Sequence, residues 1–236
     1  MKTDLDNLVS QVRRDILRMV HQVNSGHPGG SLGCTEFFVV LFNKILDFNI
    51  PFTEDGVNED VFILSNGHIS PVYYSVLSRV GFFDLNELST FRKINSRLQG
   101  HPTNHDNLPG VRISSGSLGQ GLSVGIGSAL SKRLNNDDSL VYVLTGDGEL
   151  QEGQNWEAIM FAYAKKIDNL IAIVDLNGQQ IDGSTSDVLN IGSLKEKFSS
   201  FGWEVVEIEK GNNMKEVFNG MVKAKGLTKN HKPVVV

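Results

Sequence analysis

Two short apolar runs, each ending in polar turn residues, constrain the possible folds of this chain more than any other feature. The first run, LVYVL at residues 140–144, leads to the sequence GDGE at residues 146–149. The second run, LIAIV at residues 170–174, leads to DLN at residues 175–177. Runs this short and rich in β-branched residues predict buried parallel strands. Residues 155–166 between them have the apolar spacing of a helix, so the segment is predicted to form a strand–helix–strand unit.

The polar residues that follow these two predicted strands are candidates for a metal site. Asp147 and Asn177 each come just after the carboxyl end of a strand, at the edge where open α/β sheets bind ligands. One carboxylate, one amide oxygen and neighbouring carbonyl groups form an oxygen-rich site with little charge of its own. Such a site suits Mg²⁺ that is shared with a phosphate-bearing ligand.

Composition and charge exclude several classes of protein. The length of 236 residues allows one large α/β domain or two small ones, and 40% hydrophobic residues are ordinary for a globular chain. A net charge of −5 with no basic run argues against nucleic-acid binding. No apolar stretch is long enough to span a bilayer, and residues 2–6 begin no signal-type apolar core. The single cysteine, Cys34, cannot form an internal disulfide, so we expect a cytoplasmic protein.

The rest of the chain continues the alternation of helices and strands. We predict further strands at residues 61–64, 203–208 and 233–236, and helices at residues 5–23, about 34–47, 72–80, 120–134, 194–200 and 214–225. Residues from about 97 to 119 are predicted to form a long irregular loop. With no internal repeat or low-complexity linker, we expect one doubly wound α/β domain over residues 1–236, with a mostly parallel sheet and helices on both faces. We expect the last strand to be interrupted by the end of the chain, so that this is a truncated domain or a partner completes the site.

A glycine-rich loop, GSLGQG at residues 116–121, opens the helix that precedes the first apolar run. Glycines there let backbone N–H groups approach a ligand, and a helix N-terminus favours anions. A simple glycine-rich helix start is an equally good interpretation of the loop taken alone. A dinucleotide fingerprint built on Gly119, Gly121 and Gly125 is a weaker one, because it needs a strong strand before it and residues 111–114 (VRIS) are weak and polar.

Three of the six histidines, His27, His68 and His101, lie in glycine-rich turns. One such histidine is most often a surface or capping residue. Three at strand-end turns of one sheet share a crevice, where imidazoles bind hydroxyl and carbonyl groups or transfer protons near neutral pH. A zinc site that uses His101 and His105 is an alternative, but no third ligand lies at a suitable spacing.

Two further features have ordinary structural interpretations. Glu149 and Glu152 follow the GDG turn, and charge matching at the start of the next helix explains at least one of them. Cys34 lies beside Phe37 and Phe38 and is interpreted as a small core residue.

Four motifs together carry a resemblance to a known family. They are SGHPGG at residues 25–30, LSNGH at residues 64–68, QGHP at residues 99–102, and GDGE at residues 146–149 with Asn177. The chain resembles the N-terminal, diphosphate-binding domain of transketolase, and especially the N-terminal subunit of split, two-gene bacterial transketolases. The similarity extends from the first helix to Pro233 and is more specific than the metal motif, which all thiamine diphosphate enzymes share.

The resemblance implies thiamine diphosphate held through Mg²⁺. Asp147, the side chain of Asn177 and the backbone carbonyl of Gln179 would be the protein ligands of the metal. Further contacts with the cofactor would come from a wider set of residues, namely His68, Gly116, Ser117, Leu118, Gly146, Gly148 and Glu149.

For activity, the resemblance implies transfer of a two-carbon ketol unit between ketose and aldose phosphates. His27, His68 and His101 would be the catalytic histidines, and Glu152 would lie at a subunit contact. The family's pyrimidine-binding domain, which carries the glutamate that activates the cofactor, lies outside this sequence. We therefore expect activity only with a C-terminal partner chain, a heterotetramer by analogy, and ordinary pentose phosphates as substrates.

The chain departs from the family pattern at three places. Ser117 replaces a proline, as expected of the split form, Gln179 replaces a common isoleucine, and Ile69 follows His68 where the family has a small residue. Deoxyxylulose phosphate synthases share the GDG turn, so a synthase-like activity is one alternative. A non-catalytic cofactor-binding subunit is a second, and a nicotinamide-dependent dehydrogenase is a third.

Overall fold

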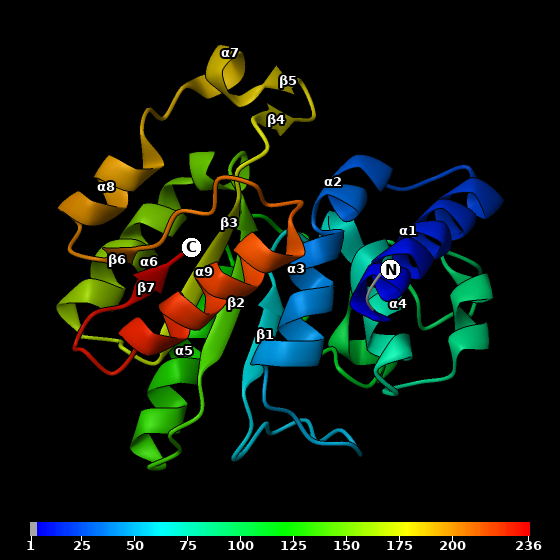
Figure 1. Ribbon diagram of the computed structural model, residues 1–236, viewed down its shortest axis with the longest axis horizontal. Helices are drawn as coiled ribbons and strands as arrows, with labels where there is room; N and C mark the ends of the chain where they lie inside the picture. The colour runs from blue at the N-terminus through cyan, green and yellow to red at the C-terminus, as the bar shows by residue number, and fades with distance from the viewer. Residues whose placement is uncertain (1–3) are drawn as a thin grey trace. The chain divides into compact units, whose positions relative to one another are not determined.

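The computed structural model describes residues 4–236, which divide into two compact units. Unit 1 consists of the chain up to Asp55, Gly67–Gly116 and Glu209–Asn219. Unit 2 consists of Gly56–Asn66, Ser117–Ile208 and Gly220–Val236. Figure 1 shows the helices of both units and the strands, all of which belong to unit 2.

Unit 2 is built on a parallel sheet of five strands in the order β1-β2-β3-β7-β6. The strands are β1 (Val61–Leu64), β2 (Val141–Gly146), β3 (Leu170–Asp175), β6 (Glu204–Val205) and β7 (Val234–Val235). Successive residues of β1 and β2 are buried, as expected of a parallel sheet whose two faces are covered by helices. The predicted α/β class and mostly parallel sheet are confirmed.

The connections between these strands place helices on both faces of the sheet. α5 (Gly121–Leu134), α6 (Gly153–Ala164) and α8 (Leu194–Ser200) each precede a strand that lies further along the sheet in one direction. α9 (Met214–Leu227) instead precedes β7, which lies back between β3 and β6. Crossovers between parallel strands are right-handed, so a helix that leads forward along the sheet and a helix that leads back lie on opposite faces. α9 therefore lies on the face opposite to α5, α6 and α8. Figure 1 shows the C-terminal half of α9 crossing in front of the strands.

The contact between α5 and the sheet depends on a glycine. Gly125 of α5 is so close to β2 that a Cβ atom there would lie 2.3 Å from Cγ2 of Val143, which is fully buried. Glycine therefore allows the helix backbone to approach the strand. Gly127, two residues further along the same helix, has nothing within 4 Å of such an atom.

We expect Gly125→Ala to lower the free energy of unfolding by about 1–3 kcal/mol, because the added methyl group overpacks the contact with Val143. Gly127→Ala should raise it by about 0.5–1 kcal/mol, because alanine is favoured over glycine at an exposed helix position. Urea denaturation of the two variants and the wild type measures both changes in the free energy of unfolding. Equal effects at both positions would contradict the packing described here.

Unit 1 is helical. α1 (Asp4–Val23) has the apolar spacing predicted for it and packs against α3 (Thr35–Val40) and α4 (Ser70–Arg79). The buried Asp15 carboxylate of α1 accepts hydrogen bonds from Ser75 Oγ at 2.8 Å and Arg79 Nε at 2.6 Å, which join α1 to α4. The other elements of this unit are α2 (Pro28–Gly33), η1 (Leu41–Ile45), η2 (Gly67–Ile69), η3 (Leu85–Thr90), η4 (Asn104–Asp106) and the start of α9.

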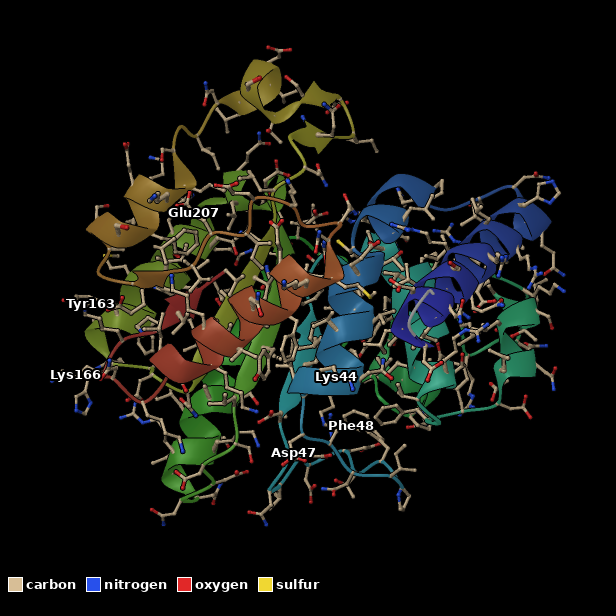
Figure 2. All side chains as sticks on the ribbon, in the orientation of Figure 1. Lys44, Asp47, Phe48, Tyr163, Lys166 and Glu207 are labelled. Carbon is tan, nitrogen blue, oxygen red and sulfur yellow. The ribbon has the colours of Figure 1, made fainter. Side chains whose placement is uncertain are left out.

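Aromatic rings pack together in unit 1 beyond the end of η1. The ring centroid of Phe48 lies 6.0 Å from that of Phe42 and 5.2 Å from that of Phe82. Figure 2 labels Phe48 with Lys44 and Asp47, where the chain leaves this helix. This packing anchors the segment that follows η1.

The structure differs from the sequence predictions mainly in short elements. The helix predicted at about 34–47 is α3 followed by the π-helical turn η1. α2 begins at Pro28, directly after His27 and inside the segment described above as a glycine-rich turn, because proline is favourable at the first position of a helix. The strand predicted at 203–208 is limited to β6.

Other short elements lie between the long ones. The hairpin of β4 (Gln179–Gln180) and β5 (Gly183–Ser184), together with α7 (Thr185–Leu189) and η5 (Glu149–Gln151), is too short to produce a periodic pattern and was not predicted. Residues 97–119 are irregular, as predicted, apart from η4. Within residues 4–236, no helix combines the length and the apolar character that crossing a membrane requires.

Candidate functional site

The turn after β2 and the loop after β3 meet at one edge of the sheet in unit 2. The two strands pair in register up to Gly146 and Asp175, so they end at the same level. The backbone N–H of Asp147 donates a hydrogen bond to the carbonyl of Asp175 at 3.2 Å. The structure therefore brings together the two segments that the sequence singled out.

Hydrogen bonds hold the carboxylate of Asp147 at this edge. Its side chain is buried, and Oδ1 accepts from Gly148 N at 2.9 Å. Oδ2 accepts from Gly178 N at 2.7 Å and from Thr185 Oγ1 at 3.4 Å. Sequence reasoning missed Thr185, because it lies in an unpredicted short helix far along the chain from Asp147.

Asn177 and Gln179 lie in the loop that binds Asp147. Asn177 is exposed, its Oδ1 accepts from Gln179 N at 2.8 Å, and its Nδ2 donates to Asp175 Oδ2 at 2.9 Å. The expected ligand set thus contains one carboxylate and two amide-type oxygens. Hard oxygen donors of this kind suit Mg²⁺, which keeps room for phosphate and water ligands.

Clusters made only of acidic, histidine or cysteine side chains are absent from the described part of the chain. No group of three or more such side chains within residues 4–236 is arranged to hold a metal ion. The zinc alternative at His101 and His105 therefore lacks a third side chain there. The amide-rich set around Asp147 contains a single carboxylate and is therefore not such a cluster, so it stays a candidate on the chemistry of its oxygen atoms.

Close packing and one unpaired buried acceptor lie beside this turn. A Cβ atom at Gly148 would lie 2.8 Å from Cβ of Gln180, so only glycine allows the turn to approach the β4–β5 hairpin this closely. Asn66, directly after Ser65 at the end of β1, is 1% exposed, and its Oδ1 has no hydrogen-bond partner. Buried acceptors are normally paired, so an orphaned one fits a site that a ligand or water completes.

The side chain of Glu149 points into the protein. It is 2% exposed and accepts hydrogen bonds from Ser65 Oγ, Gly119 N and Gly146 N. Burial raises the pKa of the Glu149 carboxyl, while these three hydrogen bonds oppose that change. Glu152, expected at a subunit contact, is exposed at the start of α6.

The glycine-rich loop contains the last residue of unit 1, Gly116, and the first residues of unit 2. Gly116 has a φ of +105°, and a Cβ atom there would lie 2.4 Å from Cδ2 of His101, so glycine is required. Leu118 is 36% exposed, although it is a large apolar side chain that core packing would normally bury. Residues 111–114 form no strand, which contradicts the dinucleotide fingerprint as an interpretation of this loop.

The three predicted histidines interact with one another within unit 1. His27 precedes α2 and His68 lies in η2, with their ring centroids 5.1 Å apart. Burial, with the nearby His27 and His101, lowers the pKa of His68 to about 4. Burial also lowers the pKa of His101, helped by the Arg92 guanidinium and His27. His68 and His101 are therefore neutral at pH 7, and each offers one hydrogen-bond donor and one acceptor.

The lowered pKa of His68 predicts a pH-dependent stability. Between pH 6.5 and about 4 the unfolded chain binds a proton at this residue that the folded chain does not. The free energy of unfolding should therefore fall as the pH is lowered through this range. Urea denaturation of the wild type and of His68→Asn checks this, because the variant should show a shallower slope. Identical slopes, or an NMR titration midpoint of His68 near 6.5, would count against the expectation.

A protein-family comparison covers nearly the whole chain. The family model described as "Transketolase, thiamine diphosphate binding domain" matches residues 5–236. The chain is 37% identical over 236 residues to a subunit of the apulose-4-phosphate transketolase of Actinobacillus succinogenes, covering 99% of this chain and 83% of that protein. It is 34% identical over 222 residues to 6-deoxy-6-sulfo-D-fructose transketolase subunit SqwG of a Clostridium species, covering 94% of this chain and 80% of that protein.

The solved structures that resemble this chain include transketolases. Transketolase from Leishmania mexicana has a TM-score of 0.90 and 29% identity, covering 100% of this chain and 36% of that one. Transketolase from Campylobacter jejuni has a TM-score of 0.87 and 35% identity, covering 100% of this chain and 37% of that one. The chain thus spans about a third of the solved transketolases that it matches, and most of the two relatives named as subunits.

Proposed function

We propose a function for this chain from one premise: the chain belongs to the transketolase family and contains that family's thiamine diphosphate-binding domain. It is the N-terminal subunit of a split transketolase, a transferase that moves a two-carbon ketol unit between ketose and aldose phosphates. The observation that carries the proposal is the match of residues 5–236 to the family domain, with the Asp147 turn bonded to the Asn177 loop at the strand ends. Units 1 and 2 together form one diphosphate-binding domain in this proposal, because the matched domain covers both.

The residues at the strand ends would hold the cofactor through Mg²⁺. The Asp147 carboxylate, the Asn177 amide oxygen and the Gln179 carbonyl are the proposed metal ligands, since they belong to one hydrogen-bonded loop and turn. Gly146, Gly148, Gly116, Ser117 and Leu118 are the proposed contacts with the rest of the cofactor. When bound, thiamine diphosphate supplies the nucleophilic carbon and the electron sink for ketol transfer.

The protein's own contribution is to bind, orient and exchange protons. His68 is proposed to contact the diphosphate, and His27 and His101 to bind sugar hydroxyls or assist proton transfer. These roles require neutral imidazole rings, because a neutral imidazole both donates and accepts a hydrogen bond. The lowered pKa values of His68 and His101 keep these two side chains neutral at pH 7.

A partner chain completes the enzyme in this proposal. The relatives named as subunits support a two-chain enzyme, in which a C-terminal subunit contributes the pyrimidine-binding domain. Self-association of two such pairs gives the heterotetramer expected by analogy. The enzyme would act in the cytoplasm on pentose phosphates, or on another sugar derivative, since one relative is named for apulose 4-phosphate and the other for the sulfonated sugar 6-deoxy-6-sulfo-D-fructose.

A ketol-transfer assay tests this function. Xylulose 5-phosphate and ribose 5-phosphate are supplied with thiamine diphosphate and Mg²⁺ to this chain alone, to its C-terminal companion alone and to their mixture. Activity is expected only in the mixture. Turnover by the chain alone, or none in the mixture on any sugar phosphate pair, would overturn the proposal.

The same assay separates the alternatives. Release of CO₂ from pyruvate in the presence of glyceraldehyde 3-phosphate would indicate the synthase-like activity instead. Normal binding of cofactor and companion with no turnover on any sugar pair would indicate a non-catalytic subunit.

A further inference from the structure

The carboxylate of Glu149 joins three segments of unit 2. Oε1 accepts hydrogen bonds from Ser65 Oγ and from Gly119 N, the latter at 2.8 Å, and Oε2 accepts from Gly146 N at 3.2 Å. Ser65 follows β1, Gly119 precedes α5 and Gly146 ends β2. One side chain therefore ties the ends of two neighbouring strands to the glycine-rich loop.

Ser65 extends this link to a second amide of the loop. Its Oγ donates to Glu149 and accepts from Gly121 N at 3.1 Å. A Cβ atom at Gly121 would lie 2.3 Å from Ser65 Oγ, so the contact requires glycine. Gly119 has a φ of +85°, a conformation that also favours glycine. Because Gly119 and Gly121 have no side chains, their backbone N–H groups can reach Glu149 and Ser65.

Glu149 is held from its backbone as well as its side chain. Its carbonyl accepts a hydrogen bond from Nδ2 of Asn155, a fully buried residue of α6, at 2.7 Å. Glu149 and Ser65 are 2% and 1% exposed. Hydrogen bonds to an ionised carboxylate are strong, and leaving their donors unpaired in a buried place is costly. The carboxylate therefore uses its oxygen atoms to bind the loop and its neighbours, and is shielded from solvent.

We propose that Glu149 is a positioning residue, which sets the loop at residues 117–121 against the turn at residues 146–148, an inference that rests on the function proposed above. The loop carries Ser117 and Leu118, and the turn carries Asp147. Direct contact between Glu149 and the cofactor, which the resemblance implied, is replaced in this proposal by an indirect role. The carboxylate aligns the two segments before the cofactor binds, so binding does not have to order them.

Hydrogen exchange of the chain without cofactor tests the positioning itself. Glu149→Gln places an amide N–H group against one of the backbone donors, and Ser65→Ala removes the hydroxyl that holds Gly121. In both variants the amides of residues 119–121 should exchange at least about tenfold faster, while those of the sheet keep their wild-type rates. Glu196→Gln is the control, because Glu196 is an exposed residue of α8 and the substitution removes the same charge elsewhere in unit 2. It should change neither the exchange rates of the loop amides nor those of the sheet amides.

Cofactor affinity tests the consequence. Isothermal titration of thiamine diphosphate with Mg²⁺ into the chain assembled with its companion should show about tenfold weaker binding for both variants. Wild-type exchange in the loop, wild-type affinity, or faster exchange throughout unit 2 would each overturn the positioning role. Failure of the wild type to bind the cofactor would instead overturn the proposed function, and the exchange data would still decide whether Glu149 orders the loop. If Glu149→Gln does not fold, Ser65→Ala decides alone.

Discussion

Replacing Asp147 with asparagine should weaken the Mg²⁺-dependent binding of thiamine diphosphate by about a hundredfold. Asp147 is the one charged group among the three proposed metal ligands, so the substitution removes the main attraction for a divalent cation. Both carboxylate oxygens also accept backbone N–H groups, from Gly148 and Gly178. An asparagine amide must therefore turn its NH₂ group toward one of these donors, which disturbs the turn.

Calorimetric titration of the cofactor, with and without Mg²⁺, measures this effect in the chain assembled with its companion. Asp187→Asn is the matched control, because Asp187 is an exposed residue of α7 in the same unit and loses the same charge. The control should bind as the wild type does. Unchanged affinity in Asp147→Asn, with a folded protein, would remove Asp147 from the metal site.

Replacing Asp137 with alanine should lower the free energy of unfolding by about 3–5 kcal/mol, because it leaves a buried cation without its partner. Lys132 is 6% exposed, and its Nζ donates to Asp137 Oδ2 at 2.8 Å and to the carbonyls of Gly56 and Glu59. Asp137 also accepts hydrogen bonds from Asn58 N and Ser139 N. This cluster joins the end of α5 to the segment that leads into β1.

Asp138→Ala provides the control for this prediction. Asp138 is the next residue, but its side chain is 95% exposed, so its loss should change stability by less than about 0.5 kcal/mol. Urea denaturation of both variants at pH 7 measures the difference. Similar losses in the two variants would show that the buried pair with Lys132 contributes little.

The Asp137 pair should also depend on pH. Burial alone would raise the pKa of the Asp137 carboxyl, but hydrogen bonds from Lys132, Ser139 and Asn58 outweigh it and hold this pKa well below the ordinary value of 3.8. A group whose pKa is lowered by folding stabilises the protein above its unfolded pKa and loses this effect as the pH falls below it. The stability gap between wild type and Asp137→Ala should therefore be constant from pH 7 to about 5 and shrink below about 4. A gap that does not shrink would contradict this assignment.

Much of unit 2 was predictable because its central elements carry strong local patterns. The apolar runs at residues 140–144 and 170–174 became β2 and β3, and the helical spacing between them became α6. Since adjacent parallel strands end at one edge, the approach of the Asp147 turn to the Asn177 loop followed from the strand assignment. The roles of these residues toward a metal and a cofactor stay predictions.

The short elements and several site contacts could not be predicted. The β4–β5 hairpin has only two residues in each strand, so it shows no alternation to detect. Thr185, which contacts Asp147, directly follows that hairpin. The missing hydrogen-bond partner of Asn66 Oδ1 can be seen only once the residues around it are placed. The three histidines belong to a different compact unit from the proposed metal ligands, which no motif indicated.

By itself, the sequence determined which segments form the strands of the parallel sheet and the long helices, and which polar residues follow the strand ends. These features follow from apolar spacing and turn residues, which act locally along the chain. Only the tertiary structure decided what Glu149 does, because its partners Gly119 and Ser65 lie 30 and 84 residues away along the chain. They meet it because β1 and β2 are neighbours in the sheet and because Gly119 and Gly121 allow the backbone to come close.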